Sequence, residues 1–362
     1  VNGKKQKNTD GTNGKYKVDP SDFVEGENEV EVVVMDKSGN RSSDSYKFSI
    51  DTTVPEKLTG SIEEEYKEYD GVVYFKSSPE VTLGARDTGV GISMFRVNGE
   101  PINGAKFNIT GGKFKVSAVD KLGNSTEPVS VNTLIGTNGD TYVIDGKDPV
   151  VKESSGFSED LKYNGLLWFA GKPRLVYSVS DPNILSVVIS VNGERVPQSI
   201  NEKGEYLVDL DGISDGEVAV KVTALDKAGN TASDNYTFML DTSAPVGVSA
   251  SVSRDFRDIG GVMYFDGVPT VSVRATDAGV GISEYVVGSE KNSDGKFELG
   301  SGTYTVKVQD RLGNVSSVVG LGKLLGGSSD TVVVDTSAPS ISESAGFDGD
   351  YTEDGKIWYS SI

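Results

Sequence analysis

The chain has 362 residues, contains neither cysteine nor histidine, and carries a formal net charge of −19. These features exclude disulfides, thiolate nucleophiles, zinc–cysteine sites and any Ser-His-Asp triad, and they argue against nucleic acid as a partner because a polyanion is repelled. The length suits two to four ordinary domains, and 44 glycines with 36% hydrophobic residues predict packed cores joined by many turns.

The first fifty residues carry two strand patterns separated by a turn signal. Residues 29–35 begin with alternating polar and apolar side chains, and residues 46–50 have the period-two pattern of a half-buried strand. Between them lies Asp36-Lys37-Ser38-Gly39-Asn40. Because Val1-Asn2-Gly3 matches Val191-Asn192-Gly193, we expect the sequence to begin inside a repeat unit and to be a piece of a longer protein.

An aspartate followed shortly by a proline marks four boundaries. The four segments are Asp51-Thr52-Thr53-Val54-Pro55, Asp145-Gly146-Lys147-Asp148-Pro149, Asp241-Thr242-Ser243-Ala244-Pro245 and Asp335-Thr336-Ser337-Ala338-Pro339. Their spacings are 94, 96 and 94 residues (145 − 51, 241 − 145 and 335 − 241). Each interval has the length of an immunoglobulin-like sandwich, which is about 100 residues.

A stronger repeat has twice that period. Asp36 to Asn40 returns as Asp226 to Asn230, and the segment that starts at Asp87 returns at Asp277. The offset is 190 residues in both cases (226 − 36 and 277 − 87). Two types of unit therefore alternate, which we call type A and type B. Copies are typical of a structural or binding array, whereas a catalyst usually has one unique site.

Type B units are distinguished by a longer connection before the last strand. About ten extra residues fall around Leu134-Ile135-Gly136-Thr137-Asn138-Gly139, and we predict a loop or a small hairpin there. The charged run from Ile62 to Tyr69 is predicted as strand or loop, because its counterpart near Val252 alternates. We predict no amphipathic helix in the chain.

The only tryptophans, Trp168 and Trp358, occupy the same position in two type A units. The apolar neighbours of Trp168 favour a buried anchor over an exposed platform for carbohydrate. We expect the sequence also to end inside a unit, since residues 357–359 match residues 167–169. The Asp-x-Gly-x-Gly-Ile segments at Asp87 and Asp277 lack the lysine of a phosphate-binding loop, and we predict bulged turns there.

Together these segments resemble the bacterial Ig-like repeat superfamily over essentially the whole chain. The pattern is Asp-x-x-Gly-Asn, then a strand, then Asp-Thr-x-x-Pro at the next boundary. The resemblance implies an all-β fold of tandem immunoglobulin-like β-sandwich domains in an elongated array. The predicted domains are partial type A, 1–51; type B, 52–146; type A, 147–241; type B, 242–336; and partial type A, 337–362.

The resemblance implies a non-catalytic spacer array of a large bacterial cell-surface or adhesin-like protein, extracellular and presenting a distal binding region. The alternatives are an accessory region of a secreted carbohydrate-active enzyme, either glycan-binding or a spacer, and an Ig-like phage or virion surface protein. The partners it implies are a host surface protein or glycan, bound through regions outside this segment, and further copies in a fibre. No apolar stretch approaches the ~20 residues of a membrane-spanning helix, so we expect no membrane insertion.

Two sets of aspartates are candidate calcium ligands at the joints between domains. One set ends a unit (Asp51, Asp145, Asp241 and Asp335), and the other opens the Asp-x-x-Gly-Asn segment (Asp36, Asp120, Asp226 and Asp310). Structural alternatives exist for both: a strand terminator before proline, and a tight turn in which Asp accepts backbone N–H bonds while Gly supplies positive φ. Because Ca²⁺ takes six to eight oxygens, carboxylates from both sets would have to converge with carbonyls and water.

Overall fold

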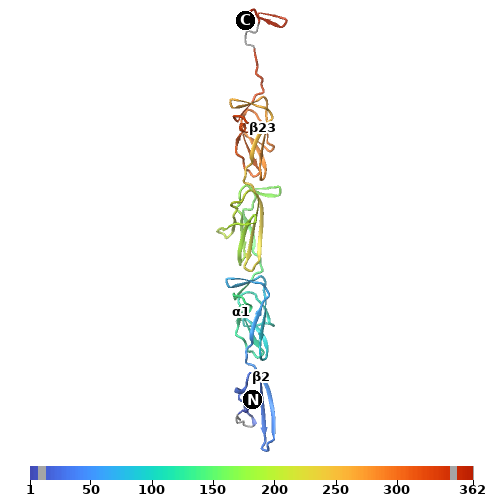
Figure 1. Cartoon of the computed structure of the whole chain (residues 1–362), viewed down its shortest axis with the longest axis vertical. Helices are drawn as coiled ribbons and strands as arrows, with labels where there is room; N and C mark the ends of the chain where they lie inside the picture. Colours follow the sequence, from blue (N-terminus) through green and yellow to red (C-terminus); the bar gives the residue numbers. More distant parts are fainter. Residues whose placement is uncertain (7–13, 343–348, 362) are drawn as a thin grey trace. The chain divides into compact units, whose positions relative to one another are not determined.

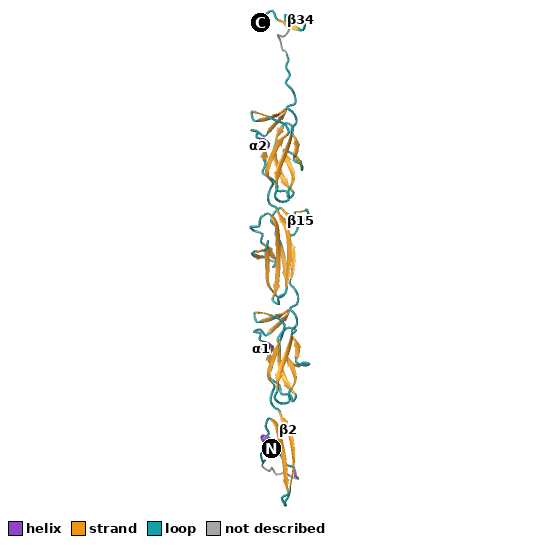
Figure 2. Cartoon of the chain, turned by 45° about the vertical axis from the view of Figure 1, so that its right-hand side comes forward, coloured by secondary structure: helices purple, strands orange, loops and turns teal. Residues whose placement is uncertain are grey.

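The computed structural model describes residues 1–6, 14–342 and 349–361, and strands account for nearly all of its regular structure (Figure 2). The chain divides into two compact units. Unit 1 contains Val1–Lys152, Ser178–Val188 and Val222–Asp234, and unit 2 contains Glu153–Tyr177, Ile189–Lys221 and Asn235–Ile362. The predicted all-β class is confirmed. None of the helices in the described ranges has the length and apolarity needed to span a membrane.

Unit 1 begins with a long two-stranded hairpin. Its elements are the 3₁₀ helix η2 (Pro20–Asp22), β1 (Gly26–Met35) and β2 (Arg41–Ile50). The strands pair antiparallel from Gly26↔Ile50 to Met35↔Arg41. With no second sheet against them among the described residues, Val33 and Val34 are each 54% exposed. These two strands therefore match the predicted strand patterns but do not enclose a core.

Residues 52–146 in unit 1 form three small sheets around one core (Figure 1). The strands are β3 (Glu56–Ser61), β4 (Lys67–Tyr69), β5 (Val72–Phe75), β6 (Glu80–Arg86), β7 (Ile92–Val97), β8 (Glu100–Pro101), β9 (Lys106–Asn108), β10 (Lys115–Asp120), β11 (Val129–Ser130) and β12 (Thr141–Ile144). The sheet orders are β3-β6-β9, β12-β5-β4 and β11-β10-β7-β8, and β5 pairs parallel with β12. Each sheet contributes a fully buried valine to the core, namely Val81, Val73 and Val116.

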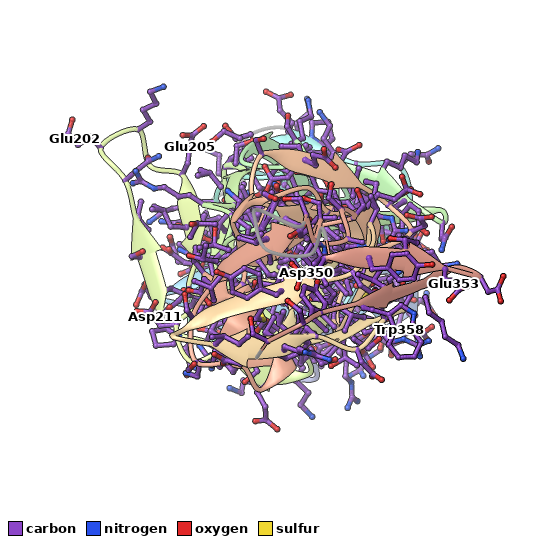
Figure 3. The ribbon with its side chains drawn as sticks, turned by 90° about the horizontal axis from the view of Figure 1, so that it is seen from above. Glu202, Glu205, Asp211, Asp350, Glu353 and Trp358 are labelled. Carbon is purple, nitrogen blue, oxygen red and sulfur yellow. The ribbon has the colours of Figure 1, made fainter. Side chains whose placement is uncertain are left out.

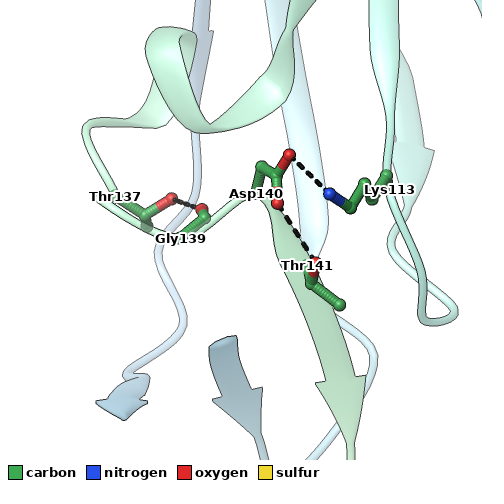
Figure 4. Close-up of polar contacts among 5 residues, drawn as sticks. All are labelled: Lys113, Thr137, Gly139, Asp140 and Thr141. Atoms are coloured by element: carbon green, nitrogen blue, oxygen red, sulfur yellow. Dashed lines mark hydrogen bonds and ion pairs between the residues drawn. The ribbon is translucent and has the colours of Figure 1, made fainter. Parts of the chain in front are cut away.

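The extra segment of this type B unit differs from the prediction of a loop or hairpin. It folds into one turn of helix, α1 (Val131–Ile135), which ends at Gly136 with φ 81°. Val131 is fully buried and joins the core, so the segment serves packing rather than exposed recognition. In the following loop Thr137 Oγ1 donates to the Gly139 carbonyl at 2.9 Å, and Asp140 accepts from Lys113 Nζ at 2.9 Å (Figure 4).

The next strands lie in residues 147–241, and the division between the units passes through five of them, β13, β16, β17, β21 and β22. The strands are β13 (Val150–Ser155), β14 (Leu161–Tyr163), β15 (Leu166–Phe169), β16 (Val176–Ser180), β17 (Ile184–Val191), β18 (Glu194–Arg195), β19 (Gln198–Ile200), β20 (Tyr206–Val208), β21 (Gly216–Asp226) and β22 (Thr231–Leu240). Their sheet orders are β13-β16-β20-β19 and β14-β15-β22-β21-β17-β18. Along β21 the burial alternates residue by residue, as expected of a half-buried strand.

Residues 242–336, all in unit 2, repeat the type B arrangement. The elements are β23 (Val246–Val252), β24 (Arg257–Ile259), β25 (Val262–Phe265), β26 (Thr270–Thr276), β27 (Ile282–Val287), β28 (Glu290–Asn292), β29 (Lys296–Glu298), β30 (Gly302–Thr303), β31 (Thr305–Asp310), β32 (Val319–Gly320), α2 (Leu321–Leu325) and β33 (Thr331–Val334). The short helix α2 again buries its first residue, Leu321, in the core. As predicted, the charged run of the first type B unit and its counterpart here contain only loop and strand.

The last described element is the hairpin of β34 (Tyr351–Glu353) and β35 (Lys356–Trp358). Its register, Tyr351↔Trp358, reproduces Leu161↔Trp168 in the earlier type A unit. Trp168 is only 7% exposed, which confirms the predicted anchor, whereas the prediction is wrong for Trp358, which is 55% exposed (Figure 3). The physical reason is that Trp168 lies on a strand paired with β22, while β35 pairs only with β34 among the described strands.

Candidate metal centre

Each boundary aspartate closes a strand with a local hydrogen bond. The Oδ1 atoms of Asp51, Asp145 and Asp241 accept from the N–H two residues later, at 3.2, 3.2 and 3.3 Å. The proline that follows can donate no ladder bond, so the strand cannot continue past the joint. The strand-terminator interpretation is therefore confirmed for these three residues, and it leaves their Oδ2 atoms available for other contacts.

The Asp-x-x-Gly-Asn segments are tight turns, as predicted. In the first type B unit Asp120 Oδ1 accepts the N–H groups of Leu122 and Asn124, both at 2.8 Å, and Gly123 has φ 94°. Its Oδ2 accepts Asn124 Nδ2 at 2.7 Å. The turns at Asp36, Asp226 and Asp310 share the Asn contacts to both carboxylate oxygens. The carboxylate thus organises its own turn.

In three of the four turns the asparagine also contacts the preceding boundary. Asn124 Nδ2 donates to the Asp51 carbonyl at 3.2 Å, and Asn314 Nδ2 donates to the Asp241 carbonyl at 3.1 Å. At the middle joint Asn230 Nδ2 contacts the Asp145 carbonyl at 2.8 Å. These bonds span 73 to 85 residues of sequence, so they attach each boundary to the sandwich that follows it.

The two predicted sets of aspartates do converge, and a third carboxylate joins each pair. The three clusters are Asp51, Asp87 and Asp120; Asp145, Asp181 and Asp226; and Asp241, Asp277 and Asp310. In each cluster one carboxylate oxygen per residue lies within 4.8 Å of the others. Sequence reasoning missed Asp87, Asp181 and Asp277. The recurrence of the segments at Asp87 and Asp277 was the signal that could have identified two of them.

The loop that supplies the third aspartate also caps the boundary residue. In the first cluster the Val90 N–H donates to Asp51 Oδ2 at 2.7 Å, and Val280 makes the same 2.7 Å bond to Asp241. A Cβ on Gly89 would lie 1.9 Å from Asp51 Oδ2, so this position admits only glycine without displacing the carboxylate. Gly89 and its equivalent Gly279 therefore leave space for the boundary carboxylate, and they do not form a phosphate-binding loop.

Joints that lead from type A to type B have an additional contact. Glu25 accepts the Thr52 N–H and hydroxyl at 3.0 and 2.8 Å. Asp215, at the equivalent position (215 − 25 = 190), accepts the same groups of Thr242 at 3.1 and 2.8 Å. The type A unit thus binds the residue after its own boundary aspartate, which fixes how the chain leaves that unit.

The clusters have the donor chemistry of a hard divalent cation. Asp87 Oδ1 is buried and has no hydrogen-bond partner, although the same carboxylate accepts the Gly89 and Gly91 N–H groups through Oδ2. None of the ion pairs found among the described residues includes one of the nine aspartates. Buried like charges without a counter-charge are unfavourable, and Ca²⁺ binds such carboxylate oxygens together with carbonyls and water. The residues therefore fit a calcium ion.

Two of the predicted ligands lie outside the clusters. Asp36 forms its own turn and is exposed, and Asp335 accepts the Ser337 N–H at 3.0 Å and is also exposed. Among the described residues, neither of them belongs to a group of three or more carboxylates close enough to share an ion. The clusters therefore do not include Asp36 and Asp335, which the sequence predicted as ligands. They include Asp87, Asp181 and Asp277, which it did not.

Comparison with known proteins places one segment in a family. The family model described as the bacterial Ig-like domain matches residues 170–242. This segment is similar to that family. The predicted resemblance to bacterial Ig-like repeats is confirmed for this segment. No curated protein matches the chain.

Several solved structures are similar to the chain at low identity. A tetra-tandem repeat in the extending region of a large adhesion protein is 19% identical, with 85% of each chain covered and a TM-score of 0.31. A 1.5-MDa bacterial ice-binding adhesin is 15% identical over 78% of this chain and all of the other, with a TM-score of 0.29. Fibronectin(III)-like modules of CbhA from Clostridium thermocellum are 12% identical over 51% of this chain and 93% of theirs, with a TM-score of 0.27.

The boundary aspartates that precede the two type B sandwiches, Asp51 and Asp241, differ in the direction in which their pKa is shifted. Hydrogen bonds from the Thr53 side chain and the Val90 N–H lower the pKa of Asp51. Burial, and then the neighbouring carboxylates of Asp277 and Asp310, raise the pKa of Asp241. A hydroxyl contributes to the contrast beside the burial of Asp241: Thr53 Oγ1 donates to Asp51 at 2.7 Å, whereas Ser243 Oγ donates to Asp215 at 2.5 Å.

We expect this contrast to appear in a carboxyl titration of the metal-free chain. Asp51 should titrate below its ordinary range, so its contribution to stability is present above that range and is lost as pH falls through the lowered pKa. Asp241 should titrate above its ordinary range, so its joint is favoured at low pH and loses stability as pH rises through the raised pKa. Carbon-detected NMR of the two carboxyl groups in EDTA checks the order, and a higher pKa for Asp51 than for Asp241 would contradict it.

Proposed function

We propose that the chain is a non-catalytic spacer region of a large bacterial surface or adhesin-like protein. The observation that carries this proposal is the joint: the same set of contacts, from three separate segments, is built three times in one chain. A repeated joint serves to connect domains in a defined way, whereas catalysis needs one distinctive arrangement of reactive groups.

In this function the chain spans distance outside the cell and presents a distal binding region. The partner of that region, a host surface protein or a glycan, is bound by sequence outside this segment. The acidic surface, with 54 Asp and Glu against 35 Lys and Arg, favours solubility of an exposed array.

We propose further that Ca²⁺ occupies the three aspartate clusters. The first would be held by Asp51, Asp87 and Asp120, and the other two by the equivalent residues. A bound ion supplies the positive charge that the buried carboxylates lack. The boundary aspartate then becomes a ligand shared with the following sandwich, so binding stiffens the joint.

The spacer function predicts an extended particle in small-angle scattering. Three complete sandwiches of ~40 Å in line give a radius of gyration of ~35 Å or more, against about 21 Å for a compact chain of this length. We expect the larger value in the presence of millimolar Ca²⁺. A value near that of the compact chain would contradict the proposal, and an EDTA sample run in parallel reports how far the joints bend without metal.

A further inference from the structure

The second residue of every Asp-x-x-Gly-Asn turn is basic. The four residues are Lys37, Lys121, Lys227 and Arg311. The turn itself does not need a charge there, because its hydrogen bonds come from the aspartate, the glycine and the asparagine. In two of the turns this side chain lies over a tyrosine that precedes the joint in sequence, and both partners of each pair lie within one compact unit.

The closer pair crosses the joint at Asp241. Arg311 Cζ lies 4.6 Å from the centre of the Tyr163 ring, which sits at the end of β14 in the β14–β15 hairpin. A second bond holds the guanidinium in place, since Arg311 Nη1 donates to the Val280 carbonyl at 3.0 Å. Val280 is also the residue whose N–H caps Asp241, so the arginine is anchored on the loop that completes the aspartate cluster.

The other pair crosses the joint at Asp145. Lys227 Nζ lies 5.6 Å from the centre of the Tyr74 ring on β5. Tyr74 is 6% exposed, while Tyr264, its equivalent 190 residues later, is 39% exposed (264 − 74 = 190). No basic side chain lies over the Tyr264 ring within the described ranges. Tyr74, which has Lys227 over its ring, is therefore buried, whereas the equivalent Tyr264, which has no basic side chain over it among the described residues, is exposed.

We propose that these pairs form a second lock at the joints, a cation–π clasp that works without metal. The hairpin of one sandwich offers the aromatic face, and the basic residue of the next turn lies over it. Cation–π contacts stabilise such arrangements because the positive charge is attracted to the negative face of the ring. By this proposal Tyr264 is a ring without its cation. The partner that it fits is the lysine of the Asp-Lys-x-Gly-Asn turn in a type A sandwich.

The test measures bending at the Asp241 joint in EDTA, so its result does not depend on calcium binding. Because the chain has no cysteine, Lys221→Cys and Lys307→Cys give two unique spin labels at exposed strand positions on either side of this joint. Tyr163→Leu and Arg311→Gln should each broaden the distance distribution of the full chain. We expect the population of the native separation relative to other separations to fall about two- to five-fold, the effect of one exposed cation–π contact.

The controls change a basic residue with no ring beneath it, Lys121 (the equivalent of Arg311), and a tyrosine with no cation over it, Tyr264 (the equivalent of Tyr74). Lys121→Gln and Tyr264→Leu repeat the same chemical changes and should leave the distribution unchanged. The double variant Tyr163→Leu/Arg311→Gln should be no broader than either single variant, since both remove one contact. Additive broadening, or equal broadening in the controls, would overturn the clasp. An unchanged distribution in both single variants would do the same.

Discussion

Removing calcium with EDTA is expected to lower the melting temperature of the full chain, and millimolar Ca²⁺ is expected to restore it. A ligand that binds only the folded state at 100 times its dissociation constant adds ~2.7 kcal/mol of stability, or on the order of 10 °C for a domain of about 100 residues. The effect should be large here because each cluster gathers three carboxylates within 4.8 Å. Calorimetry with and without chelator gives the shift.

Two aspartate variants assign that shift to the clusters. Asp120→Asn keeps a side chain that can accept the turn bonds but removes one charge from a cluster, so the calcium-dependent shift of its domain should be lost. Asp36→Asn makes the same change in the same kind of turn, outside any cluster, and should keep the full shift. A wild-type chain with the same melting temperature in EDTA and in Ca²⁺ would falsify the metal proposal.

The second large effect is expected from one methyl group. In Gly279→Ala the new Cβ would lie 1.9 Å from Asp241 Oδ2 and 2.1 Å from its Cγ, so the carboxylate must move. Overpacking of this kind costs about 1–3 kcal/mol, and the displaced carboxylate also loses the Val280 N–H bond. Denaturant unfolding of the full chain should show a less stable transition for this variant.

The matched control is Gly300→Ala in the same sandwich. An added Cβ there meets nothing within 4 Å, and this glycine, like Gly279, does not have positive φ. The control should therefore be neutral or slightly stabilising, as glycine replacement is at a compatible site. Equal stability of the two variants would show that the glycine beside Asp241 is not required by the joint.

The sequence was most informative where a local rule has one structural solution. Asp120, Gly123 and Asn124 predict a tight turn because the carboxylate and the positive φ allow little else, and the structure has that turn. The alternating pattern of residues 46–50 predicted a strand that the structure has as the end of β2, since burying one face of a sheet imposes period two. The boundary aspartates were also recognised correctly as strand ends.

The rest depended on contacts that sequence spacing does not encode. Asp87 lies 36 residues after Asp51 (87 − 51), and only the folded sandwich brings their carboxylates together. Its glycines were interpreted as turn residues, whereas Gly89 is needed because a carboxylate occupies the space of a side chain. The helix α1 was missed because one helical turn is too short for a 3.6-residue period to be visible.

The segments that supply each cluster also determine where the chain can be divided into modules. Because Asp241 precedes Pro245 yet contributes to the cluster of Asp277 and Asp310, the self-sufficient module starts upstream of the first strand of its sandwich. A recombinant domain cut at Thr242 would leave two carboxylates without the residue that completes their set. For the same reason, each sandwich that is added to such an array must bring the aspartate before it to complete its own set of carboxylates.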